Sequence, residues 1–452
     1  MTRAHWGTRL GFIFAVAGSA VGLANIWRFP YIVGTNGGAA FLFVYFLSLL
    51  VIGFPVFIAE ILIGRTVQMD PSGAFKKLGR NAYWGAAGKL TVITGFIVSS
   101  FYSAVAGWIL GYLIESMRGS LSNFSTTAES VSYFNSLIAN PLWCVGFHLI
   151  FQIFCASVLY LGVRKGIERW NEILMPMLFV VLILLVAKGL SMPGAKAGLN
   201  FLFTPDWSAL TPTAILIALG QSFFTLSLGQ GTMVTYGSYL STHENLVKSC
   251  VPVLLMDTLV SILAAVAVFT IVFSAGVEPD SGPGLIFETL PWIFSQMPGG
   301  YVMGILFFLL VLLAAITSEI SAMEPTIAYL MDEKGFGRHT AVITASIGVF
   351  ILGIPSALSY SIFSGTSFFG SNFLDFISFV CSSILIPVGG FFAIILVGWR
   401  WGTSNAITHL KQGACGLFEK NPWIGNYFSF CFKYCAPVLM LIVFFNALGV
   451  FG

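Results

Sequence analysis

Four carboxylates lie within strongly apolar stretches of the sequence. They are Glu60, Asp257, Glu319 and Glu324. A carboxylate in a lipid-embedded segment costs several kcal/mol unless it is paired or hydrated. Because no Lys or Arg lies at the same depth of these stretches, the carboxylates predict an interior cavity that binds a cation.

Neutral oxygens accompany these carboxylates. Thr317 and Ser318 directly precede Glu319, and Ala314 lies one helical turn earlier. Hydroxyl, amide, carboxylate and backbone carbonyl oxygens suit hard cations such as sodium, and an unwound helix frees its carbonyls. An enzyme has less support, because the sequence has no H-E-x-x-H, no paired Cys/His metal spacing and no P-loop. We therefore expect an ion-binding protein rather than an enzyme.

The elements that carry these oxygens must be membrane helices. Of the 452 residues, 57% are hydrophobic and 9% are charged, whereas a soluble domain has about 25% charged residues. The apolar residues form runs of about 20, the length that a bilayer crossing requires. We predict an all-α membrane protein with eleven transmembrane helices, at approximately 10–33, 40–64, 90–114, 141–161, 172–190, 212–238, 250–275, 300–330, 340–358, 374–399 and 432–451.

Charge predicts the orientation of these spans. Lys and Arg accumulate in short cytoplasmic loops, and with the N-terminus inside, all but four of the 21 basic residues fall on the cytoplasmic side. The exceptions are Arg28, Arg118, Lys188 and Lys196. We expect a multi-pass protein of the plasma (inner) membrane, with a retained, cytoplasmic N-terminus and the C-terminus outside. The loop bias accounts for the net charge of +3, so membrane lipid is an expected partner and nucleic acid is not.

Small and polar residues interrupt two of the spans. In the first they are Gly18, Ser19, Gly22 and Asn25, and in the sixth they are Gly220, Ser222, Thr225, Ser227, Gly229 and Gly231. Glycines that only let helices pack closely are one explanation. Asn, Gln and Thr beside the glycines favour broken helices instead, because polar groups at mid-membrane are costly without a task.

The two interrupted spans hold the same place in successive sets of five. Such a pair is the sequence signature of a transporter built from a five-plus-five inverted repeat. We predict one transport domain over 1–452, with repeats at about 10–190 and 212–399 and an extra helix at about 432–451.

Motifs along the whole chain resemble neurotransmitter:sodium symporters. The run W-G-T-R-L-G-F-I-F-A-V-A-G-S-A-V-G-L-A-N-I-W-R-F-P-Y, followed by N-G-G-A-A-F, resembles the first span and first outer loop of that family. G-Q-S-F-F-T-L-S-L-G in the sixth span, A-A-I-T-S in the eighth and K-G-I-E-R ahead of Met-Pro in the fifth extend the resemblance. Eleven spans are typical of its bacterial amino-acid transporters, of the LeuT type. The resemblance implies sodium-driven amino-acid symport by alternating access, with two sodium ions and no organic cofactor.

The resemblance also implies the binding residues. The first sodium site would use the Ala20 carbonyl, Asn25, Thr225 and Asp257, with the substrate carboxylate. The second would use the carbonyls of Gly18, Val21 and Ala314 and the hydroxyls of Thr317 and Ser318. The substrate pocket would be lined by Ser19, Ala20, Gly22, Leu23, Val98, Tyr102, Phe224, Thr225, Ser227, Gln230, Ser318 and Ala322.

Gates are implied in the same way. Tyr102 and Phe224 match the aromatic lid of the pocket, and Gly166 and Pro176 match the Gly-x9-Pro spacing that lets the fifth span unwind and hydrate the second sodium site. The gate residues implied are Arg28 and Asp375 outside, and Arg3, Trp6, Tyr239 and Asp332 inside.

The substrate follows from a few positions. Monoamine carriers have Asp in place of Gly22, so the glycine here leaves room for a substrate carboxylate and implies an amino acid. Ala24, Gln230 and Glu319 depart from the family pattern. Gln230, Glu319 and the small Ala322 favour a roomy pocket with polar reach, which fits a large neutral or polar side chain.

Chloride is not expected to be required. Chloride-dependent relatives carry Asn where this chain has Asp257, and their remaining anion ligands are matched by Tyr45, Gln221, Thr225 and Ser261. A fixed carboxylate can supply the negative charge that a bound anion supplies elsewhere.

Two alternative functions stay open. A proton-coupled carrier of the same architecture would use Asp257, Glu60 or Glu319 as its proton site, although Thr317 and Ser318 favour sodium. An amino-acid sensor would need a partner-binding domain, for which the loops are too short.

Overall fold

The computed structural model describes residues 3–276 and 283–450, whose regular elements are helices. The first part of the chain forms α1 (Arg9–Ala20), η1 (Ala24–Arg28), α2 (Phe29–Thr35), α3 (Ala39–Ser48), η2 (Leu49–Gly53), α4 (Phe54–Val67), α5 (Pro71–Gly79), α6 (Ala82–Met117), α7 (Thr127–Ile138), α8 (Pro141–Tyr160), η3 (Val163–Glu168), α9 (Arg169–Leu190) and α10 (Ala195–Phe203). The second part forms η4 (Trp207–Ala209), α11 (Pro212–Phe224), α12 (Thr232–Ser238), α13 (Leu246–Ser274), η5 (Pro283–Leu285), α14 (Thr289–Gln296), α15 (Gly300–Asp332), α16 (Arg338–Ala357), α17 (Phe373–Phe379), η6 (Val380–Leu385), α18 (Ile386–Ile395), η7 (Leu396–Arg400), α19 (Thr403–Lys411), α20 (Cys415–Lys420), α21 (Trp423–Phe430), η8 (Cys431–Cys435) and α22 (Ala436–Ala447).

Helices lie at all eleven positions where spans were predicted. By length and composition, nine helices of the described residues can cross a membrane, and the bent pair Arg9–Ala20 and Ala24–Thr35 makes a tenth. The sixth predicted span corresponds to the two short helices α11 and α12. The predicted all-α membrane fold with broken first and sixth spans is therefore confirmed. The third span is longer than predicted, at Ala82–Met117, and the eleventh begins earlier, at Trp423.

Short polar side chains set where several helices begin. Thr8 accepts a hydrogen bond from the Gly11 amide at the start of α1, and Asn245 accepts one from the Lys248 amide at the start of α13. Asn372 does the same at the start of α17. These N-caps satisfy amides that a helix leaves without partners.

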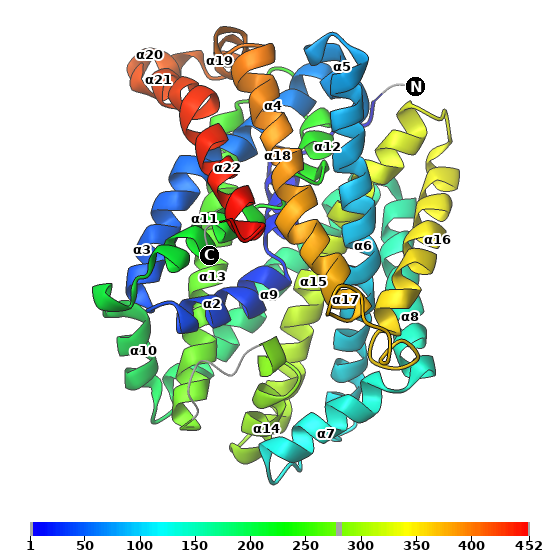
Figure 1. Ribbon diagram of the computed structural model, residues 1–452, viewed down its shortest axis with the longest axis vertical. Coiled ribbons are helices and arrows are strands. Elements are labelled where there is room, and N and C mark those ends of the chain that lie inside the picture. Colours follow the sequence, from blue (N-terminus) through cyan, green and yellow to red (C-terminus); the bar gives the residue numbers. More distant parts are fainter. Residues whose placement is uncertain (1–2, 277–282, 451–452) are drawn as a thin grey trace.

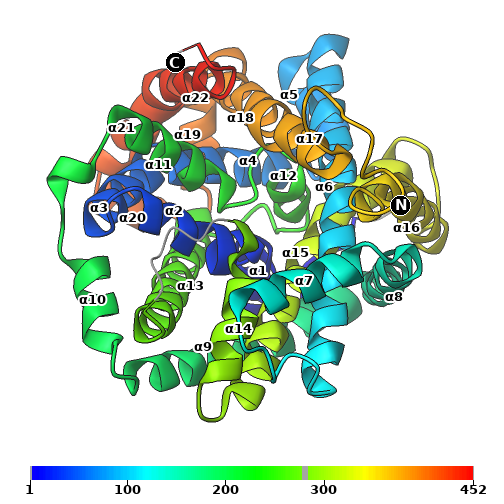
Figure 2. The ribbon, with the colours of Figure 1, turned by 60° about the horizontal axis from the view of Figure 1, so that its bottom comes forward.

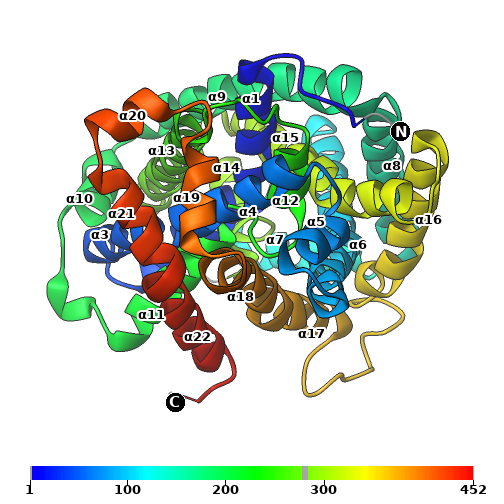
Figure 3. The ribbon, with the colours of Figure 1, turned by 90° about the horizontal axis from the view of Figure 1, so that it is seen from above.

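The helices around the two breaks form the centre of the molecule. Figure 1 shows α5, α19 and α20 at the end where the N-terminus lies, and α7 and α14 at the opposite end. Figures 2 and 3 both show α1, α12 and α15 inside a rim that includes α8, α10, α16 and α22. The segment between α13 and α15 contains α14, which packs on α15 and α7, and residues 277–282 of that segment lie outside the described residues.

Specific residues maintain both breaks. The first span bends by 53° after α1. In the sixth, Ser227, Gly229 and Gly231 have φ of +52°, +75° and +79°, a region that only glycine enters readily. Ser227 is held there because its hydroxyl donates to the Ser19 carbonyl at 2.8 Å, and the freed Gly229 amide donates to Glu60 at 2.8 Å.

Replacing Gly229 by Ala is expected to destabilise the protein. The left-handed φ alone should cost about 1–3 kcal/mol, and an added Cβ would lie 2.0 Å from the Ile386 carbonyl oxygen. Thermal unfolding in detergent measures the loss. Gly220→Ala is the matched control on the same span, because its Cβ would meet only Val443 at 3.7 Å. Equal unfolding midpoints for the two variants would show that the break does not depend on Gly229.

Candidate functional site

A cavity of about 500 Å³ lies between the broken spans and extends to α17. Its wall contains eleven of the twelve residues predicted for the substrate pocket: Ser19, Ala20, Gly22, Leu23, Val98, Tyr102, Phe224, Ser227, Gln230, Ser318 and Ala322. The twelfth, Thr225, is buried behind the wall, where its hydroxyl donates to Asp257 at 3.0 Å. The residues assigned to one pocket thus come together from four different spans.

Part of the cavity wall was missed from the sequence. The additional residues of the first, third and sixth spans are Ala24, Trp27, Tyr31, Phe101, Val105 and Leu228. The tenth span contributes Leu374, Ser378, Phe379, Cys381, Ser382 and Ile386 beside the predicted Asp375. Asp375, Ser378, Ser382 and Ile386 follow the spacing of one helix face. Once Asp375 is predicted to face the cavity, this spacing predicts that the other three residues line it as well.

The side chains predicted for the first sodium site form a buried cluster. The Asn25 amide nitrogen donates to Asp257 at 2.7 Å and to Thr225 at 3.1 Å. The Asn25 oxygen accepts the Gly22 amide at 3.1 Å. Ser261, predicted as part of an anion pocket, joins the cluster 2.8 Å from the Asn25 nitrogen. One carboxylate, one amide and two hydroxyls therefore meet at the break of the first span.

The other residues matched to an anion pocket adjoin this cluster. The Tyr45 hydroxyl lies beside Thr225, Ser261 and Asp257. Gln221 is buried on α11, one turn before Thr225. Neither amide atom of Gln221 has a hydrogen-bond partner among the described residues. The neutral groups of an anion pocket are thus present, but with a carboxylate in their midst.

Four of the five residues predicted for the second sodium site, Gly18, Ala314, Thr317 and Ser318, meet where α1 packs on α15. The Thr317 hydroxyl lies 3.1 Å from the Ala314 carbonyl, and the Ser318 hydroxyl lies 3.5 Å from the Gly18 carbonyl. The approach requires a glycine at the break, because a Cβ on Gly22 would lie 2.6 Å from the Ser318 oxygen. Backbone carbonyls and hydroxyls from the two helices thereby face each other.

The prediction that Glu324 lies without a basic partner and helps to bind a cation was wrong. Glu324 is fully buried but is paired with Arg338 at 2.5 and 2.8 Å, and it also accepts the Tyr239 hydroxyl at 2.6 Å. Arg338 begins α16, and the turn between α15 and α16 lets its long side chain reach back to Glu324. Glu324 therefore needs no bound cation, and Asp257 is the carboxylate that contacts other residues predicted to bind sodium.

Glu319 does not reach the substrate cavity. It is fully buried, and its carboxylate lies beside Ser99 of α6 and Cys155 of α8. Successive helical residues differ by about 100° in direction, so Glu319 points away from the face that carries Ser318 and Ala322 into the cavity. The predicted contribution of Glu319 to the pocket was wrong, whereas Gln230 does line the cavity.

The residues predicted for the inner gate contact one another. Arg3 pairs with Asp332 and donates to the Ser238 hydroxyl at 2.6 and 3.2 Å. The backbone amide of Trp6 donates to the Tyr239 carbonyl at 3.1 Å, and the Arg3 guanidinium lies over the Tyr239 ring, 4.8 Å from its centroid. The segment before α1 is thereby tied to the ends of α12 and α15.

The residues predicted for the outer gate lie apart. Arg28 and Asp375 both line the cavity, but no ion pair joins them in the structure of residues 3–276 and 283–450. The Arg28 guanidinium lies over the Phe224 ring, 4.8 Å from its centroid, while Asp375 accepts the Asn372 side-chain amide at 2.7 Å. The contacts predicted for the inner gate are therefore formed, and those predicted for the outer gate are not.

The fifth span begins irregularly at the position predicted for unwinding. Gly166 lies in the π-helical turn η3, and Pro176 lies inside α9. At the end of this turn, Glu168 accepts the amides of Gly7 and Thr8 at 2.7 and 2.9 Å. The inner end of the fifth span therefore holds the segment that enters α1.

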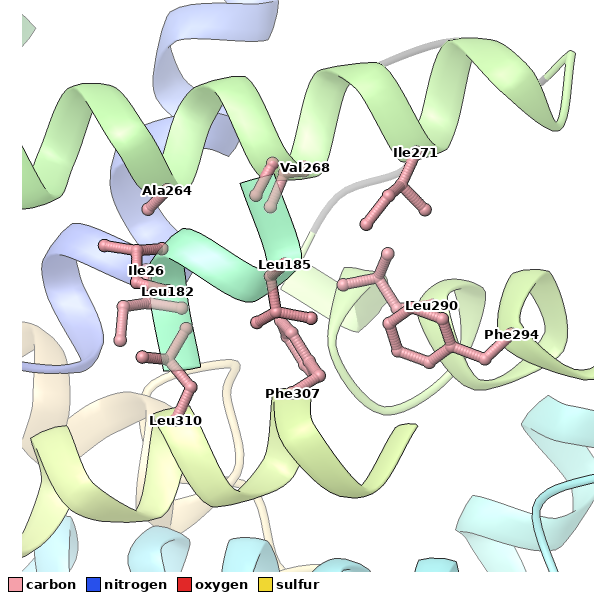
Figure 4. Close-up of a pocket in the computed structure, with 11 residues that line it drawn as sticks. Ile26, Leu182, Leu185, Ala264, Val268, Ile271, Leu290, Phe294, Phe307 and Leu310 are labelled. Carbon is pink, nitrogen blue, oxygen red and sulfur yellow. The ribbon is translucent and has the colours of Figure 1, made fainter. Parts of the chain in front are cut away.

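A second, much smaller cavity differs in chemistry. It has a volume of about 10 Å³ and only apolar lining residues. Figure 4 shows that Leu290 and Phe294 of α14, Leu185 of α9 and Val268 of α13 surround this cavity. An apolar space of this size stays dry, so it is a packing gap beneath α14 and cannot orient a charged ligand.

Comparisons with known proteins agree with this geometry. The sequence profile of the Sodium:neurotransmitter symporter family matches residues 3–136 and 141–451. An uncharacterized sodium-dependent transporter of Bacillus subtilis is 37% identical over 99% of this chain and 98% of its own length. The sodium-dependent serotonin transporter of Drosophila melanogaster is 27% identical over 99% of this chain and 77% of its own length.

A solved structure is similar over the whole chain. The crystal structure of MhsT in complex with L-phenylalanine has a TM-score of 0.89 and 42% sequence identity, covering 99% of this chain and 100% of that one. The symporters of the matched family are transporters rather than enzymes. The chain therefore belongs to the Sodium:neurotransmitter symporter family and is a sodium-dependent integral membrane transporter.

Proposed function

We propose that this transporter imports a large neutral amino acid by alternating access, together with two sodium ions. The observation that carries the proposal is that the ends of three half-helices and two groups of oxygens meet at one cavity. The protein would lie in the plasma membrane, with its N-terminus in the cytoplasm and its C-terminus outside.

The helix ends fit a zwitterion. Within the described chain no side chain caps the start of η1, and the adjacent residues Leu23 and Ala24 line the cavity. Free amides at the positive end of a helix dipole bind carboxylates. The carbonyl ends of α1 and α11 lie at the same breaks and attract an ammonium group. The substrate backbone would therefore lie between the first and sixth spans.

The two oxygen groups fit two sodium ions. The first oxygen group contains Asp257. A 180° rotation of the Asn25 side-chain amide would place its oxygen, instead of its nitrogen, beside that carboxylate. The second has only neutral oxygens, from Gly18, Val21, Ala314, Thr317 and Ser318. Each sodium ion gains about 2.3 kcal/mol from a potential of 100 mV and about 1.4 kcal/mol from a tenfold gradient. Two ions could thus concentrate a zwitterion by roughly five orders of magnitude.

The cavity wall fits a large side chain. Val98, Ala322 and Ile386 provide apolar contact, and Gln230 adds an amide that makes no hydrogen bond to the described part of the chain. The related MhsT structure contains L-phenylalanine, which supports a large neutral substrate. An amide with a free donor and acceptor would extend the range to side chains with a polar end.

Removing the hydroxyls of the second group should abolish sodium-dependent transport. Thr317→Ala combined with Ser318→Ala leaves only backbone carbonyls there. The measurement is uptake of labelled amino acids into proteoliposomes driven by a sodium gradient. Thr326→Ala is the control, because this hydroxyl lies on the same helix without a partner in the described structure. Unchanged sodium dependence in the double variant would contradict the second site.

Transport should not require chloride. Asp257 supplies negative charge among the neutral groups of the anion pocket, and a chloride about 4 Å away would be repelled by about 4 kcal/mol at an effective dielectric of 20. Asp257→Asn should create chloride-dependent or chloride-stimulated uptake. The test replaces chloride by gluconate in both proteins, and strong chloride dependence of the wild type would refute the role of Asp257.

Gln230 should determine which large side chains bind well. Gln230→Leu is expected to weaken binding of tyrosine, tryptophan or glutamine by about tenfold, the value of one hydrogen bond, and to leave leucine and phenylalanine binding intact. A thermal-shift screen of the twenty amino acids in sodium measures this, with Ser378→Ala as a control on the outer wall. A carrier that accepts only glycine and alanine would contradict the proposed substrate class.

A further inference from the structure

Asn171 is a buried amide whose oxygen has no assigned role. It lies in the first turn of α9 and is 0% exposed. Its side-chain nitrogen donates to the Ile167 carbonyl at 2.8 Å. This bond fixes the orientation of the amide, but the opposite atom, Oδ1, has no hydrogen-bond partner in the described residues. Burying an amide oxygen without a hydrogen-bond partner costs folding free energy. A ligand bound to this oxygen would remove that cost.

The Asn171 oxygen lies against Gly18, one of the residues proposed to bind the second sodium ion. A Cβ built on Gly18 would lie 2.1 Å from Asn171 Oδ1 and 3.1 Å from the Thr317 Cβ. Gly18 and Thr317 are both proposed ligands of the second ion. The helices α1, α9 and α15 each pack against the other two, so the oxygen enters from the third helix of this junction.

We propose that Asn171 Oδ1 is an additional sodium ligand at the second site. This inference rests on the proposed function, because it adds a ligand from α9 to the oxygens that α1 and α15 supply. Amide oxygens are suitable ligands for hard cations, and the bond to Ile167 prevents Asn171 from presenting its nitrogen instead. The carbonyls and hydroxyls at the α1–α15 contact are neutral, so a sixth oxygen adds affinity without adding charge.

The location of Asn171 also assigns it a part in sodium release. The residue lies three positions after Glu168, which holds Gly7 and Thr8 ahead of α1. Its oxygen therefore approaches the ion from the inner end of the fifth span. When α1 separates from α15, an ion still bound to Asn171 would remain with α9 and move toward the cytoplasmic side.

Substitutions of opposite electrostatic effect test the assignment. Asn171→Leu keeps the approximate shape and removes the oxygen, and it should raise the sodium concentration for half-maximal binding by at least about tenfold. Asn171→Asp keeps the oxygen and adds negative charge, and it should lower that concentration and slow turnover by retaining the ion. Binding of radioactive sodium to the full-length protein in detergent gives the first quantity, and uptake in proteoliposomes gives the second.

Gln152→Leu is the matched control. Gln152 is also a buried amide with an oxygen that lacks a partner in the described structure, but it contacts Met323, beyond the proposed site. Its substitution should leave sodium binding unchanged. A purely structural role of Asn171 would make the Leu and Asp variants shift sodium affinity in the same direction, or not at all, and either result would overturn the proposal.

The proposed function and this inference fail in different ways. If the Thr317→Ala and Ser318→Ala double variant keeps normal sodium dependence, the second site itself is wrong. If that double variant loses sodium dependence while Asn171→Leu binds sodium as the wild type does, only the assignment of Asn171 is wrong.

Discussion

The architecture depends on the requirement that backbone polar groups inside a membrane be satisfied. A continuous helix meets this requirement by itself, whereas a broken helix exposes amides and carbonyls at each end of the break. Here the Gly229 amide is satisfied by Glu60, and the Ser19 carbonyl by the Ser227 hydroxyl. Groups left free beside these supports are the ones available to ions and substrate, so the breaks create the binding site.

The buried carboxylates serve different purposes. Glu60 supports the break of the sixth span, and Glu324 joins Arg338 and Tyr239 at the inner end of the molecule. Only Asp257 lies among groups that match a sodium site. Neither oxygen of Glu319 has a hydrogen-bond partner among the described residues, so a carboxylate in an apolar sequence does not by itself identify a bound ion.

The sequence predicted more of the fold than of the site walls. Apolar runs and interrupted spans reflect the bilayer directly, so all eleven positions and both breaks could be predicted. The pairing of Glu324 with Arg338 depends on how a turn directs a long side chain, and basic residues near a cytoplasmic loop carry no signal for such a contact. Asn171 was missed for a related reason, because its significance depends on the packing of three helices around Gly18.

The contacts of the predicted inner gate and the proposed second sodium site both hold α1 and the segment before it against α15. The segment before α1 is attached to α15, α12 and the fifth span through Arg3, Trp6 and Glu168. Farther along α1, the Gly18 carbonyl faces Ser318 of α15. A ligand shifts a conformational equilibrium only by its difference in affinity between the two states. The proposed ion shared by α1 and α15 would lose ligands if these helices separated, so it would favour the state in which they are in contact. Release of that ion would remove the link between α1 and α15. Separation of the two helices would then require only that the polar contacts of Arg3, Trp6 and Glu168 break.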